Sequence, residues 1–165
     1  MYSPYMQTPQ NPQQIYGMKW FKFLIYFSLF FGALLNLSTA MQFSNGTIYL
    51  TQGLEQYQID FLYLRYPNLQ TLDKASSVFY ACFAIYAIIV RFQLAKYRRN
   101  GPSMVLSIPV IGVLLHFAHE AISAIILSVS FSEVLPSFLI SVICSGIYFW
   151  LNYIYFRKRS HLFTN

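Results

Sequence analysis

The chain has 165 residues, of which 56% are hydrophobic and only 10% charged, and its formal net charge is +6. Soluble domains carry about 25% charged residues, so this composition argues against a soluble globular fold. Four membrane spans of ~25 residues would use most of this length. A separate soluble catalytic domain is therefore not expected.

Residues 1–17 are rich in Gln, Pro and Tyr and hold no charged side chain. This composition predicts a disordered cytoplasmic tail, because the segment has too little apolar surface to form a core. Residues 18–165 are predicted to form one four-helix transmembrane domain.

Four long apolar runs follow the tail. About 20 apolar residues in a helix span the ~30 Å hydrocarbon core of a bilayer. The runs mostly lack the polar positions that would recur about every 3.6 residues in a soluble helix. The sequence therefore predicts an all-α membrane protein, a bundle of four transmembrane helices. The spans are expected near 20–40, 75–95, 104–129 and 135–156.

The first run has an alternative interpretation as a signal peptide. Ser38-Thr39-Ala40 resembles a small-residue cleavage site that follows an apolar stretch of suitable length. The region before that stretch is long and mostly uncharged, which favours a helix that is retained.

The segment 42–74 is the only sizeable loop on the side opposite the termini. A short interfacial helix is expected there, ending where Tyr66-Pro67 disfavours helix. Asp73 or Ser76 is expected to cap the start of the second transmembrane helix.

Basic residues gather at the same ends of the four runs. Only Arg65 and Lys74 fall on the other side if the helices alternate in direction. The positive-inside rule then predicts a cell-membrane protein with both termini in the cytoplasm. Basic residues next to a membrane span attract anionic lipid headgroups. The side chain of Arg91 is expected to extend outward toward these headgroups. Nucleic acid is not an expected partner. The residues predicted at headgroups are Arg91, Lys96, Arg98, Arg99, Arg157, Lys158 and Arg159; Lys19 and Lys22 flank the first run.

One cluster in the third run holds ionisable side chains inside the predicted bilayer. His116, His119 and Glu120 share a helix face by their i,i+3 and i,i+4 spacing. Such residues are costly in a membrane and are functional candidates by default. They could ligate a divalent metal or relay protons, with Asn36 and Asn152 as polar partners. The alternative is a structural role, in which the histidines hydrogen-bond to Asn36, Asn152 or Ser145 while Glu120 reaches the outer interface or pairs with a histidine. A zinc hydrolase is disfavoured because H-x-x-H-E matches neither hydrolase motif.

Four stretches of the sequence carry a resemblance to a known group. They are KWFKFLIYFSLFFGALLNL, YPNLQTLD, RFQLAKYRRNGP and YFRKRSHLF. Together they resemble a family of small four-helix membrane proteins of Gram-positive, gut-type bacteria, over about 18–165. Many members carry a short zinc ribbon before the helices, but this chain has no Cys before Cys82. The resemblance implies location and topology and supplies no activity.

No nucleotide-binding loop and no nucleophile constellation is recognisable in the sequence. The leading prediction is therefore a non-enzymatic accessory or interaction module without a cofactor, paired with another membrane protein or with a second copy of itself. The alternative is a small transporter or an ion- or proton-binding protein that uses His116, His119 and Glu120.

Overall fold

The computed structural model describes residues 18–163, and the tail predicted for 1–17 lies outside these residues. Every regular element between 18 and 163 is helical. The all-α prediction is therefore confirmed. The elements are α2 (Lys19–Phe23), η1 (Leu24–Ser28), α3 (Leu29–Asn45), η2 (Thr47–Gln52), α4 (Gln56–Arg65), α5 (Pro67–Ala95), α6 (Gly101–Leu127), α7 (Phe131–Arg157) and η3 (Ser160–Leu162).

Four helical stretches are long and apolar enough to cross a membrane, as predicted. They are Lys19–Asn45, Pro67–Ala95, Gly101–Leu127 and Phe131–Arg157. The largest difference from the sequence prediction is the start of the second stretch. It begins at Pro67 rather than near residue 75, because proline is well suited to the first turn of a helix, where its missing N–H is not needed.

The first stretch is continuous but contains a π-helical turn, η1. A π turn alters the backbone pairing of the helix around it. Here the Ile25 carbonyl oxygen accepts a hydrogen bond from Arg91 Nε at 3.0 Å. Part of the Arg91 guanidinium is therefore bound within the protein, and the predicted headgroup contact applies to its remaining N–H groups.

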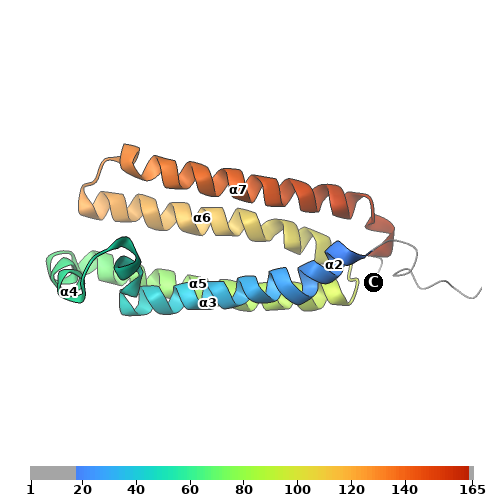
Figure 1. Cartoon of the computed structure of the whole chain (residues 1–165), viewed down its shortest axis with the longest axis horizontal. Helices are drawn as coiled ribbons and strands as arrows, with labels where there is room; N and C mark the ends of the chain where they lie inside the picture. Colours follow the sequence, from blue (N-terminus) through green and yellow to red (C-terminus); the bar gives the residue numbers. More distant parts are fainter. Residues whose placement is uncertain (1–17, 164–165) are drawn as a thin grey trace, which may run out of the picture.

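The helices form two layers (Figure 1), with α3 packed along α5 and α7 packed along α6. Contact between α5 and α6 joins the two layers. Helix α7 packs chiefly against α6, and no residue in its most apolar stretch is buried within the described chain. The most apolar stretches of α6 and α7 are therefore less buried within the chain than those of the first two spans.

The connection between α3 and α5 folds back as a cap over one end of the bundle, formed by η2 and α4. Gly46 ends α3 in a left-handed conformation with φ 70°, which favours glycine. Helix α4 begins with a capping box, in which the Glu55 N–H donates to Gln58 Oε1 at 2.8 Å. Tyr49, Ile59 and Leu69 form the buried core that holds the cap to the start of α5.

Charge is divided between the two ends of the bundle. The ends of α5 and α7 and the starts of α2 and α6 meet at one end, called the basic end here, which holds nine of the eleven Lys and Arg residues (Figure 1). The opposite end, the capped end, holds all five acidic residues. The acidic residues are Glu55, Asp60, Asp73, Glu120 and Glu133.

Candidate functional site

Asp73 lies in the second turn of α5 and is completely buried. The sequence suggested that it would cap this helix, but that prediction is wrong because α5 already begins at Pro67. A buried carboxylate is costly unless each oxygen has hydrogen-bond donors or a charged partner. The groups around Asp73 therefore define the site.

Three side chains from three other elements meet the Asp73 carboxylate. Tyr49 of η2 and Tyr63 of α4 both donate their hydroxyl hydrogens to Oδ2, at 3.0 and 2.8 Å. His119 of α6 lies with Nε2 2.9 Å from Oδ1. These four side chains, Tyr49, Tyr63, Asp73 and His119, are called the aspartate cluster below. The cluster joins the cap to both layers of the bundle.

The two tyrosines are held in their protonated, donating form. Burial raises the pKa of Tyr49 well above its usual value near 10, and the negative charge of Asp73 raises it further. A smaller contribution to Tyr49 comes from the charge of Glu120. Burial and the hydrogen bond to Asp73 raise the pKa of Tyr63 in the same direction. Both hydroxyls therefore remain donors across the physiological pH range.

His119 is fixed on two sides. Its side chain is 12% exposed and that of Asp73 is 1% exposed, so their contact is shielded from solvent. The ring of Phe43 from α3 lies 4.6 Å from the His119 ring, centroid to centroid, at a tilt of 56°. With Nε2 facing the carboxylate, the imidazole donates to Asp73 either as the neutral Nε2–H tautomer or as the imidazolium.

The structure separates the residues that the sequence grouped as a metal site. Within residues 18–163, no three His, Cys, Asp or Glu side chains are arranged so that they could hold a metal ion. His119 is paired with Asp73, while His116 and Glu120 are partly exposed on α6. The three residues of the predicted metal site therefore do not meet at one point in the described chain.

Asn152 is not a partner of the histidines. It is completely buried at the basic end, where Trp20 Nε1 donates to its Oδ1 at 3.2 Å and its own amide donates to the Tyr148 carbonyl oxygen at 2.8 Å. Asn36 lies partly exposed on α3, outside the aspartate cluster. For His119, the polar partner expected from the sequence is therefore replaced by Asp73, which in turn accepts from the two cap tyrosines.

Sequence reasoning missed Asp73 as a site residue, although a signal was available. If the helix is started at Pro67, Asp73 lies within a membrane-length helix and becomes an intramembrane ionisable residue. Tyr49 and Tyr63 offered no comparable signal, because they lie 24 and 10 residues from Asp73 in the sequence.

Comparison with known proteins gives no relative. No family model matches the chain, and no match is found among curated proteins or solved structures. The resemblance to small membrane proteins of gut-type bacteria therefore stays a prediction, and a function has to be argued from the geometry of the chain.

Proposed function

We propose that this chain is a multi-pass protein of the cell membrane that acts as a non-enzymatic accessory or interaction module, with its cap as the contact surface. The observation that carries this is an exposed apolar stripe on α4. Tyr57, Phe61 and Leu64 are 67%, 62% and 79% exposed, and their i,i+4,i+7 spacing places them on one helix face. Ile59, on the opposite face, is buried. The stripe therefore faces away from the protein.

The aspartate cluster supports the same proposal because it holds the cap in one position. Tyr63 is part of α4 and bonds directly to Asp73, so the helix that carries the stripe is fixed to the bundle. A preorganised surface binds with a smaller loss of conformational entropy than a mobile loop does. The partner that fits is another membrane protein with an apolar surface close to the bilayer.

Photo-crosslinking in intact cells tests this proposal. A photoreactive amino acid in place of Phe61 is expected to give an adduct with a protein, and the same group in place of Gln52, an exposed polar residue of η2, is expected to give none. Adducts with lipid alone at Phe61 would mean that α4 lies in the headgroup region and has no protein partner. An adduct with a second copy would make the module a homo-oligomer.

A second candidate function is proton binding by Asp73 and His119. It is favoured by the buried contact between a carboxylate and an imidazole, two groups that exchange protons readily. Proton flux into liposomes that contain the purified chain tests it, with His119→Gln as the variant and His161→Gln as the control. His161 lies in η3 at the basic end and is exposed. Equal flux in all three proteins and in empty liposomes would exclude transport.

The orientation that this proposal requires has both termini and the basic end in the cytoplasm and the cap outside. Its support is the division of charge between the two ends. Cysteine labelling with an impermeant reagent tests it, in a background where Cys82 and Cys144 are replaced by Ser. A cysteine in place of Thr51 should react in intact cells and one in place of Ser160 should not. The reverse pattern would invert the orientation.

A further inference from the structure

Two hollows follow one another along the groove between α6 and α7. The first lies at the basic end, has a volume of about 400 Å³, and is bordered by Arg99, Ser103, Leu106, Tyr153 and Arg157. It is called the headgroup pocket below. The second has a volume of about 330 Å³ and is bordered by Pro109, Val110, Val113, Val142, Gly146 and Phe149. It is called the acyl groove.

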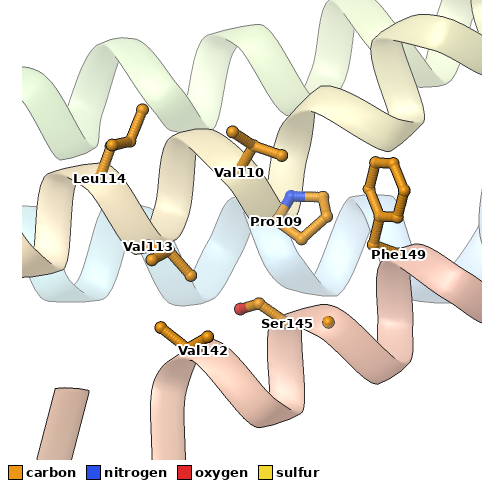
Figure 2. A pocket seen from close by; sticks show the side chains of 8 residues that line it. Pro109, Val110, Val113, Leu114, Val142, Ser145 and Phe149 are labelled. Atoms are coloured by element: carbon orange, nitrogen blue, oxygen red, sulfur yellow. The ribbon is translucent and has the colours of Figure 1, made fainter. Parts of the chain in front are cut away.

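The two hollows lie on the same seam between the helices. Leu106 of the pocket and Val110 of the groove are four residues apart on α6, and Tyr153 and Phe149 are four residues apart on α7. Residues at i,i+4 share a helix face, so the acyl groove begins one turn deeper in the bundle than the headgroup pocket. Figure 2 shows the apolar side chains of α6 and α7 lining the two sides of the acyl groove, with Phe149 toward one end and Val142 toward the other.

The chemistry changes along this seam as it does along a phospholipid. The headgroup pocket carries two exposed guanidinium groups, Arg99 and Arg157, beside a floor that includes the buried ring of Phe156. The acyl groove is apolar apart from Ser145, and nothing beyond the adjoining backbone of α7 lies within 4 Å of the position that a Cβ on Gly146 would take. The cationic headgroup pocket matches the charged headgroup of a phospholipid, and the apolar acyl groove that continues from it matches an acyl chain.

No acidic residue of the chain is placed to neutralise these arginines. All five Asp and Glu residues lie at the capped end, and the one ion pair within residues 18–163 joins His119 to Asp73. Within residues 18–163, neither guanidinium group therefore has an acidic side chain as its counter-ion. Basic pockets between transmembrane helices bind anionic headgroups.

We propose that the seam between α6 and α7 is a binding site for one anionic phospholipid. Its phosphate lies between Arg99 and Arg157, and one acyl chain follows Leu106 and Val110 toward Val142. The planar guanidinium groups suit phosphate oxygens, which accept paired N–H donors. This site is independent of the cap surface proposed above, since it lies at the opposite end of the bundle and on other helices.

The test uses the full chain, reconstituted in phosphatidylcholine with added phosphatidylglycerol and then washed in detergent, with retained lipid counted by native mass spectrometry. The unaltered protein is expected to retain phosphatidylglycerol in preference to phosphatidylcholine. An Arg99→Gln, Arg157→Gln pair should lower that retention roughly 25-fold, from the loss of two basic groups at a headgroup. A Lys19→Gln, Lys22→Gln pair removes the same charge at the same end, outside the pocket, and should leave retention unchanged. An equal loss in both pairs would mean general surface attraction and would overturn the site.

The acyl groove is tested by a matched pair of glycine substitutions. Gly146→Leu fills the groove and should abolish retention of phosphatidylglycerol. Gly32→Leu adds the same side chain on α3, where nothing lies within 4 Å, and should retain the lipid.

Glycerol phosphate is the probe for a free phosphate. If it displaces the bound lipid completely at equal concentration, the arginines bind phosphate without the groove and the phospholipid assignment is wrong.

Discussion

The two ends of the bundle differ in how their charged side chains are neutralised. At the capped end, Asp73 is buried and fully bonded by Tyr49, Tyr63 and His119. At the basic end, Arg99 and Arg157 are exposed and no acidic residue lies near them. The capped end therefore neutralises its buried charge within the chain, while the two arginines of the basic end face the surroundings of the chain, although a core of ten buried residues lies beneath them. Substitutions of these charged groups should consequently change stability most at Asp73 and lipid retention most at Arg99 and Arg157.

The largest effect is expected from Asp73→Ala. It leaves two tyrosine hydroxyls and an imidazole without their shared acceptor, and breaking a buried polar network from one side costs about 3–5 kcal/mol. Thermal unfolding of the purified chain in detergent measures this. Asp60→Ala is the control, because Asp60 is exposed on α4 and bonds only to Gln56 within one helix turn. Its expected effect is within about 0.5 kcal/mol. Similar losses in the two variants would contradict the assigned role of Asp73.

The next effect is expected from Gly46→Ala. A Cβ at Gly46 would lie 2.8 Å from the Tyr63 hydroxyl oxygen, the atom that donates to Asp73. The positive φ adds a cost of about 1–2 kcal/mol for any other residue. Gly53→Ala is the matched control, because it has φ +92° but nothing within 4 Å. Unfolding should show a larger loss at Gly46 than at Gly53, and equal losses would mean that backbone strain alone acts there.

The sequence predicted the helices well and the aspartate cluster poorly, for one physical reason. A membrane span is a local property, so apolar runs and terminal Lys and Arg residues are enough to place all four. Hydropathy alone places the start of α5 too late, because the first turns of this helix are polar. Pro67 is the residue that marks its true start. The cluster depends on the η2–α4 cap folding back over α5. Asp73 and His119 are 46 residues apart, and no spacing rule relates them.

Alkaline pH should reveal how tightly the cap tyrosines are held. Their pKa values are raised in the folded protein, by burial first and by Asp73 second. Above pH ~10 the unfolded chain therefore loses these protons while the folded chain keeps them, and stability falls as pH rises. Tyr63→Phe removes one such group, so its stability should fall less steeply with pH than that of the unaltered protein.

Tyr57→Phe is the control for this measurement, because Tyr57 lies in the same helix but is 67% exposed. Chemical unfolding at a series of alkaline pH values gives the slopes. The slope for Tyr57→Phe should match that of the unaltered protein. Equal slopes for Tyr63→Phe and the unaltered protein would mean that the Tyr63 hydroxyl does not donate to Asp73 in solution.

The smallest effect is expected at the basic end, from Trp20→Phe. This change removes the indole N–H that donates to Asn152 Oδ1, while Asn152 keeps its own bond to the Tyr148 carbonyl oxygen. An uncharged buried acceptor left without its donor costs about 1–3 kcal/mol, so the loss should be below that of Asp73→Ala. Trp150→Phe is the control, since Trp150 is 62% exposed on α7. Thermal unfolding should rank Trp20→Phe below Asp73→Ala and above Trp150→Phe. If Trp20→Phe equalled Asp73→Ala, the neutral hydrogen bonds of Asn152 would contribute as much stability as the charged network of Asp73, and the contrast between the two polar clusters would be wrong.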